Sequence, residues 1–161
     1  MGKSIAYLFP GQGSQTVGMG ETLANKFPDF KKIFTDTLKE ADEILGFSLS
    51  EIIKSGPAEK LKETEITQPA LLTVSTAMGR WLHSKNINPH FVLGHSLGEY
   101  SALVQAEAIQ FKDAVKLVQL RGRLMQNAVP FGKGGMAALV GASSEDAQKL
   151  CESISQLSGK V

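Results

Sequence analysis

The chain has 161 residues, 42% of them hydrophobic, and a formal net charge of +1. This length suffices for one domain with a sizeable core, and the balanced charge gives no electrostatic case for binding nucleic acid or an anionic membrane surface. The single cysteine, Cys151, cannot form an internal disulfide, and the first apolar run, residues 5–9, is too short for a signal-peptide core or a membrane span. We therefore expect a cytoplasmic protein that binds neither nucleic acid nor membrane.

Strands and helices are predicted to alternate through the first 130 residues. A short buried strand is expected at 4–9 and a second one at 91–93. Helices are expected at 21–26, 29–45, 50–54, 67–85, 97–106 and 112–126. The helix at 67–85 would carry Pro69 in its first turn, where proline is tolerated. This order is typical of a layered α/β domain with a parallel sheet.

The pattern changes near Pro130. A glycine-rich loop at 131–135 precedes an expected third strand at 136–140, and Ser143 offers an N-cap to a helix ending near Gln156. Residues 158–161 resemble a turn that enters another strand. We interpret residues 1–130 as part of a large α/β domain and residues 131–161 as the incomplete start of a second, smaller one.

Residues 94–98, Gly-His-Ser-Leu-Gly, match the G-x-S-x-G pattern of a nucleophile elbow. In that motif Ser96 occupies a tight strand-to-helix turn, and Gly94 and Gly98 let neighbouring backbone approach closely. The turn also places the serine at a helix N-terminus, whose amides favour developing negative charge. The pattern alone is weak, but an expected strand precedes it and an expected helix follows. A serine in a purely structural turn is the alternative.

A second loop, Pro-Gly-Gln-Gly-Ser-Gln at 10–15, also follows an expected strand. Because the carboxyl ends of parallel strands share one edge of a sheet, this loop and the elbow can face one crevice. An oxyanion hole would need the amide of Leu97 and a second donor, for which the N–H of Gln12 is a candidate. The spacing excludes a dinucleotide fingerprint and a P-loop. A plain turn remains the alternative.

Arg121 shares a helix face with Leu117 and Leu124, so its charge needs an anion or must reach water. Its planar guanidinium suits two-point contact with a carboxylate. The functional interpretation is recognition of a free carboxylate on a substrate. Helix spacing alone favours a structural salt bridge instead, for example to Glu99 or Asp113.

None of the three histidines is a good general base for Ser96. His95 is its direct neighbour, so we expect its side chain to point elsewhere and to support the elbow. His90 lies at the opposite end of the strand, roughly 20 Å away at ~3.3 Å per residue. His83 is expected near a helix C-terminus, exposed to solvent. The sequence thus supplies a nucleophile without an evident base.

Taken together, the motifs resemble malonyl-CoA:acyl-carrier-protein transacylases of fatty-acid synthesis. The resemblance is carried by LFPGQGSQ at 8–15, GHSLGEY at 94–100, QLRGRLMQ at 119–126 and GGMAAL at 134–139, in the family's order and spacing. It implies a large α/β-hydrolase-like domain with an inserted ferredoxin-like subdomain, of which the segment after Gly134 would be the beginning.

The resemblance also implies a mechanism and its residues. Ser96 would attack malonyl-CoA, form a malonyl ester and pass the group to the phosphopantetheine thiol of acyl carrier protein. Gln12 and Leu97 would form the oxyanion hole, Arg121 would bind the malonyl carboxylate and Met125 would line the acyl pocket. No metal or cofactor is expected.

Members of that family are considerably longer, and their catalytic histidine would lie beyond Val161. We therefore expect this chain to be a fragment with little activity by itself. Three alternatives remain: a hydrolase with the same elbow, the acyltransferase domain of a polyketide synthase, and a fragment that binds acyl-CoA or carrier protein without turnover. Arg121 argues against the hydrolase, because lipase-like sites are mostly apolar.

Overall fold

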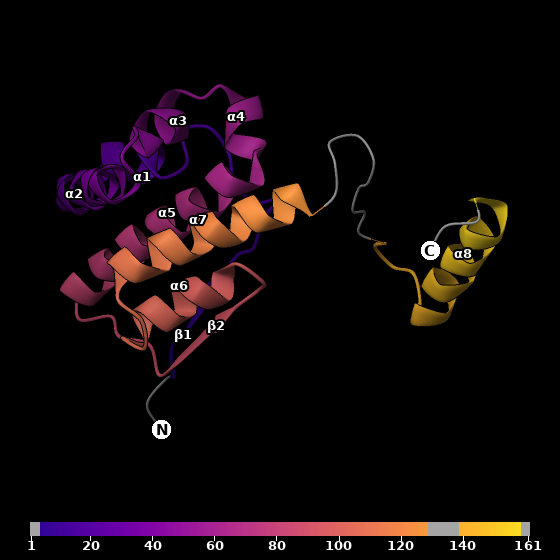
Figure 1. Ribbon diagram of the computed structural model, residues 1–161. Coiled ribbons are helices and arrows are strands. Elements are labelled where there is room, and N and C mark those ends of the chain that lie inside the picture. The colour runs from indigo at the N-terminus through magenta and orange to yellow at the C-terminus, as the bar shows by residue number, and fades with distance from the viewer. Residues whose placement is uncertain (1–3, 129–138, 159–161) are drawn as a thin grey trace. The chain divides into compact units, whose positions relative to one another are not determined.

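The computed structural model describes residues 4–128 and 139–158, and the chain divides into two compact units, residues 1–129 and 130–161. The first unit contains the two strands found among the described residues and most of the described helices (Figure 1). In chain order its elements are β1 (Ala6–Phe9), α1 (Glu21–Lys26), α2 (Pro28–Leu45), α3 (Leu49–Ser55), α4 (Ala58–Lys62), α5 (Thr64–Ser84), β2 (Phe91–Gly94), α6 (Gly98–Gln105) and α7 (Phe111–Asn127). The predicted α/β class is confirmed.

The two strands form a parallel pair in which Tyr7 is in register with Val92 and Phe9 with Gly94. Side chains alternate between the two faces of a strand, and the described residues cover only one face of this sheet. Tyr7 and Phe9 are buried against α6, whereas Leu8, Phe91 and Leu93 are more than half exposed. Among the described residues, β2 is the only strand that pairs with β1, so the other edge of β1 is open.

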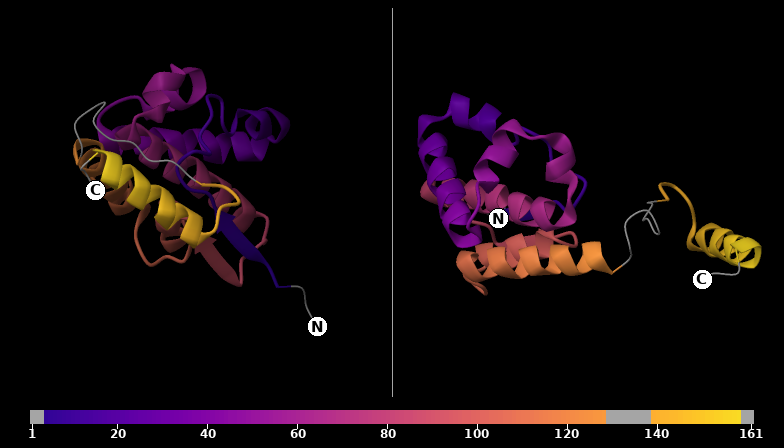
Figure 2. Two further views of the ribbon diagram at one scale, coloured as in Figure 1. Left: turned by 90° about the vertical axis from the view of Figure 1, so that its right-hand side faces the viewer. Right: turned by 45° about the horizontal axis from the view of Figure 1, so that its top comes forward.

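Helices α5 and α7 lie side by side across the middle of this unit (Figures 1 and 2). Their close approach depends on Gly122, because a Cβ atom there would lie 2.6 Å from the carbonyl oxygen of Thr64. Helix α2 packs on α5 and contributes Phe30, Phe34 and Leu38 to the main core. The helix layer therefore has a continuous core to which the sheet is joined at one side.

One helix begins three residues earlier than the sequence predicts, and one helix was not predicted. Helix α5 begins at Thr64 rather than residue 67, so Pro69 lies beyond the first turn. The earlier start arises because the carbonyl of Glu63 already accepts the N–H groups of Ile66 and Thr67. The short helix α4 was not predicted, and it places Leu61 in the core.

In the second unit the structure describes α8 (Ser144–Ser158). Ser143 caps this helix as predicted: its Oγ accepts the N–H of Asp146 at 3.1 Å and donates to the Asp146 carboxylate at 2.6 Å. The predicted strand at 136–140 falls largely outside the described residues, and Leu139 and Val140 are not in a strand. The predicted turn at 158–161 also falls outside them, apart from Ser158, which ends α8.

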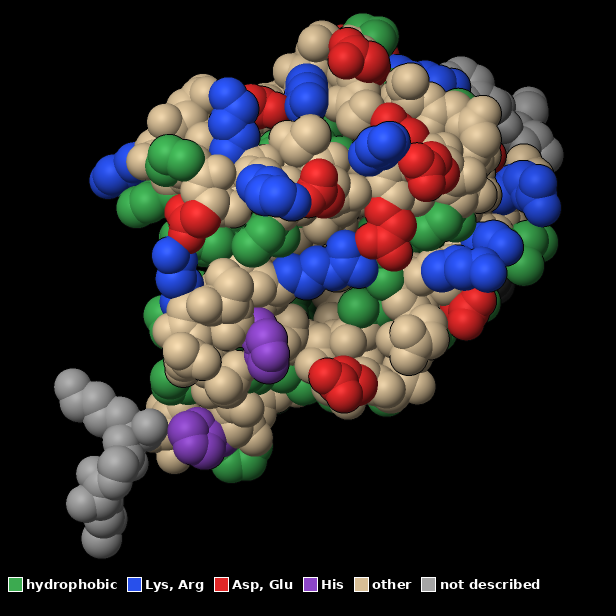
Figure 3. All heavy atoms as spheres, turned by 90° about the vertical axis from the view of Figure 1, so that its left-hand side faces the viewer, with side chains coloured by type: hydrophobic (Ala, Val, Ile, Leu, Met, Phe, Trp, Pro, Cys, Tyr) green, Lys and Arg blue, Asp and Glu red, His purple; other side chains and the backbone are tan. Residues whose placement is uncertain are grey.

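Acidic and basic side chains are interspersed on the face of the molecule that Figure 3 shows, in keeping with the balanced net charge. Within the described ranges, no helix has both the length and the apolar character needed to cross a bilayer.

Candidate active site

Ser96 lies in the sharp turn between the end of β2 and the start of α6. Its φ angle is 53°, in the left-handed region that residues other than glycine seldom adopt, and such a conformation costs about 1–3 kcal/mol. The turn is held on both sides, because the N–H of His95 donates to the carbonyl of Phe9 at 3.1 Å and the N–H of Gly98 donates to the carbonyl of His95 at 2.9 Å. The strained serine is therefore fixed by backbone bonds to β1 and within the turn.

The glycines that flank the turn are required by close backbone contacts. A Cβ atom on Gly94 would lie 2.0 Å from the carbonyl carbon of Gly98, and one on Gly98 would lie 2.2 Å from the carbonyl oxygen of Phe9. Either side chain would force the first turn of α6 away from the strands. This is the close approach that the G-x-S-x-G pattern predicts.

The loop after β1 lies directly beside the elbow. A Cβ atom on Gly11 would lie 2.7 Å from Nδ1 of His95, so the imidazole packs against this loop and not on the Ser96 hydroxyl. The side-chain amide of Gln12 donates to the hydroxyl of Thr64 at 3.2 Å, which ties the loop to the start of α5. The predicted proximity of the two loops is thus observed.

Several backbone N–H groups in these loops have no hydrogen-bond acceptor among the described residues. Two of them belong to Gln12 and to Leu97, the residue that precedes α6. The Leu97 side chain is buried in the main core, with 1% of its surface exposed, and it anchors the backbone of the turn there. Free N–H groups beside a strained serine are what an oxyanion hole needs.

Arg121, on α7, reaches the elbow. Its Nη2 donates to Oγ of Ser96 at 3.3 Å, and its guanidinium carbon lies 5.7 Å from the centre of the Tyr100 ring. The salt bridge to Glu99 or Asp113, which helix spacing favoured, is not present among the described residues. A cation without a carboxylate partner in this part of the chain therefore lies next to the serine hydroxyl.

A further polar residue, which the sequence analysis missed, joins Arg121 to Met125. Gln68 of α5 is completely buried; its Oε1 accepts from Arg121 Nη1 at 2.8 Å, and its Nε2 donates to the Met125 sulfur at 3.2 Å. The available signal was a lone amide among apolar residues immediately before Pro69. Met125 itself is 42% exposed and lies one helical turn from Arg121.

The histidines lie in the described part of the chain, and none hydrogen-bonds to Ser96 there. His90 Nδ1 accepts the N–H of Ile5 at 3.1 Å, at the opposite end of the strands from the elbow. His83 is in the last turn of α5. Because His95 packs on Gly11, none of them is placed to take the serine proton.

Comparison with known proteins identifies the family. The family described as acyl transferase domain matches residues 6–159 of this chain. The chain belongs to the acyl transferase domain family. Its elbow, loop 10–15 and Arg121 are all within the matched region.

Curated relatives of this acyl transferase domain share about half of its residues. The malonyl CoA-acyl carrier protein transacylase of Escherichia coli K12 is 50% identical over 149 residues, which cover 92% of this chain and 47% of the relative. The protein of the same name from Bacillus subtilis is 48% identical over 152 residues, covering 94% of this chain and 47% of the relative. The chain thus spans about half the length of the curated relatives it matches.

Solved structures of malonyl transacylases also resemble this chain. A malonyl-transacylase in complex with the acyl-carrier protein of a type II polyketide synthase superposes with a TM-score of 0.86 at 45% identity, covering 96% of this chain and 49% of that one. The malonyl CoA-acyl carrier protein transacylase of Coxiella burnetii gives a TM-score of 0.85 at 43% identity, covering 94% and 47%. The α/β architecture of this acyl transferase domain is therefore shared with malonyl transacylases.

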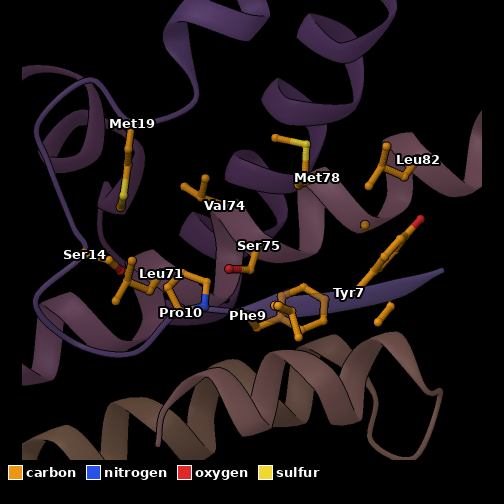
Figure 4. A pocket seen from close by; sticks show the side chains of 13 residues that line it. Tyr7, Phe9, Pro10, Ser14, Met19, Leu71, Val74, Ser75, Met78 and Leu82 are labelled. Carbon is orange, nitrogen blue, oxygen red and sulfur yellow. The ribbon is translucent and has the colours of Figure 1, made fainter. Parts of the chain in front are cut away.

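A cavity of about 410 Å³ in the acyl transferase domain lies away from Ser96. Figure 4 shows that side chains of β1 and α5 line it, among them Tyr7, Phe9, Val74 and Met78. Its wall is mainly apolar and includes neither Ser96 nor Arg121. This cavity is therefore separate from the contact between Ser96 and Arg121.

Proposed function

We propose that this chain carries the nucleophile of a malonyl-CoA:acyl-carrier-protein transacylase of fatty-acid synthesis. The observation that carries the proposal is the 3.3 Å contact between Nη2 of Arg121 and Oγ of Ser96, made by a cation that has no carboxylate partner in the described residues. A guanidinium in that position can hold the free carboxylate of a malonyl group while its thioester carbonyl lies at the serine.

The proposed reaction has two halves. Ser96 Oγ attacks the thioester carbonyl of malonyl-CoA and gives its proton to a general base; the carbon–sulfur bond then breaks and CoA leaves as a thiol that takes this proton. In the second half the phosphopantetheine thiol of acyl carrier protein attacks the malonyl-Ser96 ester, and the serine regains a proton. The free N–H groups of Gln12 and Leu97 would stabilise the oxyanion in both halves.

We further propose that the general base is a histidine from a region corresponding to the remaining half of the longer relatives. Support comes from the positions of His83, His90 and His95, none of which contacts Ser96. Residues 1–130 would then be the N-terminal part of an α/β-hydrolase-like domain and residues 131–161 the start of a ferredoxin-like subdomain. We place the protein in the cytoplasm because its single cysteine cannot form an internal disulfide.

A polyketide pathway is the second candidate for the same chemistry. It is favoured by one observation, the similarity to a malonyl-transacylase that was solved with a polyketide acyl-carrier protein. The rates of malonyl transfer to a fatty-acid acyl carrier protein and to a polyketide acyl carrier protein would distinguish the two candidates.

The test is mass spectrometry after incubation with malonyl-CoA, using this chain and a version extended with the remaining half of the Escherichia coli relative. The extended protein should gain one malonyl group on Ser96, and Ser96→Ala should gain none. The short chain should react at least about 10²-fold more slowly, since a positioned base contributes 10²–10⁴-fold. Equal rates would show that a histidine of the short chain is the base, and modification elsewhere would refute Ser96 as nucleophile.

A further inference from the structure

Gln68 holds the guanidinium of Arg121 from the side opposite the solvent. It is completely buried on α5, and its Oε1 accepts a hydrogen bond from Arg121 Nη1 at 2.8 Å. The contact is possible because Gly122, the residue after Arg121, lets α7 approach the start of α5 closely. The other terminal nitrogen of Arg121, Nη2, is left on the Ser96 side.

The second hydrogen bond of Gln68 fixes which way its amide points. A terminal amide can in principle exchange its oxygen and nitrogen by a 180° rotation. Here the partners allow one orientation: a guanidinium has only donors and must face Oε1, and a thioether sulfur has only an acceptor and must face Nε2. Met125 therefore keeps the Gln68 oxygen directed at Arg121.

The neutrality of Gln68 is as important as its position. Its carbonyl satisfies one donor of Arg121 without cancelling the positive charge, whereas a glutamate of the same length would form a buried ion pair with it. A carboxylate already on Arg121 would compete with a carboxylate brought by a substrate.

We propose that Gln68 is the positioning residue that orients Arg121 and keeps its charge available for the carboxylate of the acyl group. This inference rests on the proposed function, because it specifies how the same site selects a dicarboxylic acyl thioester. The competing explanation is that Gln68 only stabilises the packing of α5 on α7. The two explanations differ in what a charge at position 68 does.

The experiment compares binding of malonyl-CoA and acetyl-CoA to the full 161-residue chain by calorimetry. Gln68→Glu keeps the acceptor and adds a charge, Gln68→Met removes the acceptor at similar volume, and Thr76→Val is a matched control on the same helix. Thr76 is buried, and its hydroxyl has no hydrogen-bond partner among the described residues.

The wild-type chain should bind malonyl-CoA more tightly than acetyl-CoA. Gln68→Glu should weaken malonyl-CoA binding by about tenfold or more, the lower end of measured couplings between close charge pairs, and leave acetyl-CoA unchanged. Gln68→Met should also reduce the preference, and Thr76→Val should preserve it. Equal weakening of both thioesters by Gln68→Glu, or no change, would overturn the role of Gln68. A wild-type chain without any preference would instead overturn the proposed function.

A measurement on the wild-type chain decides the question if the Gln68 variants do not fold. Nitrogen-15 NMR reports rotation of the Arg121 guanidinium, with Arg121→Lys used to assign the signal. Slow rotation of this group, compared with the exposed Arg123, is expected if Gln68 holds it. Rotation as fast as that of Arg123 would show that Gln68 does not hold the Arg121 guanidinium, whether or not either thioester binds.

Discussion

Nη2 of Arg121 lies 3.3 Å from Oγ of Ser96, although 25 positions separate the two residues in the sequence. The contact brings a fixed positive charge to the atom that would become acylated. It depends on three pieces of structure: the strained turn that presents Ser96, the packing of α7 on α5, and the buried amide of Gln68.

Replacing Arg121 with alanine should change acyl selectivity in the extended enzyme. Loss of one partner of a desolvated charge pair costs about 2–5 kcal/mol, which is roughly 30- to 4,000-fold. We expect kcat/KM for malonyl-CoA to decrease by a factor within this range, while kcat/KM for acetyl-CoA is retained. Arg123→Ala, an exposed change on the same helix, is the matched control. Equal losses with both thioesters would mean that Arg121 has only a structural role.

The backbone of Ser96 should make glycine more stabilising than alanine at this position. At φ 53° an L-residue is disfavoured by about 1 kcal/mol or more, and glycine is not. Urea unfolding should therefore give Ser96→Gly a free energy of unfolding about 1 kcal/mol above that of Ser96→Ala. Both variants should lose the malonyl ester. Equal stabilities would show that the turn relaxes when the hydroxyl is removed.

Gly98→Ala should damage the elbow even though alanine favours helices. The new methyl group would lie 2.2 Å from the Phe9 carbonyl oxygen, which is backbone and cannot rotate away. We expect a loss of about 1–3 kcal/mol in the free energy of unfolding and slower malonylation of Ser96. Glu99→Ala, on the exposed side of the same turn, should have neither effect. A fully active Gly98→Ala variant would show that the close contact is dispensable.

Asp29 should make stability fall in acid. Hydrogen bonds from the Lys85 ammonium and the Trp81 indole lower the pKa of Asp29 from its ordinary 3.8 to about 2. Because the folded-state pKa is lower than the unfolded one, this stabilisation is complete above about pH 4 and is lost as the pH falls through 2. The stability difference between wild type and Asp29→Asn, measured by urea unfolding, should shrink over that window.

The matched control for Asp29 is Glu107→Gln, since Glu107 forms no ion pair or hydrogen bond through its side chain among the described residues. The stability difference of Asp29→Asn from the wild type should change more between pH 4 and pH 2 than that of Glu107→Gln. Equal changes for the two variants would rule out the Lys85 and Trp81 contacts as the cause.

The elbow was predictable because its geometry is local. Three residues, 95–97, connect the end of β2 to the start of α6, and the flanking glycines indicate close backbone contact from the sequence alone. The order of strands and helices was predictable for a similar reason, since hydrophobic periodicity and turn residues act within one segment. The acyl transferase family was recognisable because several such local motifs occur in a fixed order.

The environment of Arg121 was not predictable from its own helix. Helix spacing favoured Glu99 or Asp113 as the partner of Arg121. The close packing at Gly122 instead brings its side chain to Gln68 of α5 and to Ser96 of the elbow. Gln68 was missed because a single amide in an apolar helix reveals neither of its partners. The start of α5 was misplaced because the bonds to the Glu63 carbonyl depend on how α4 ends.

The parallel pairing of β1 with β2 has a consequence for the order of folding. It brings Ala6 beside Phe91, although helices α1 to α5 lie between them in the sequence. Closing so long a loop costs conformational entropy that only contacts formed later can offset. Contacts of α2 with α5 span far less sequence and can form first. We expect pulsed hydrogen exchange to protect amides of α2 and α5 before those of the strands. The serine turn, held to Phe9 by a backbone bond, would then take its strained form late, on a scaffold that is already rigid.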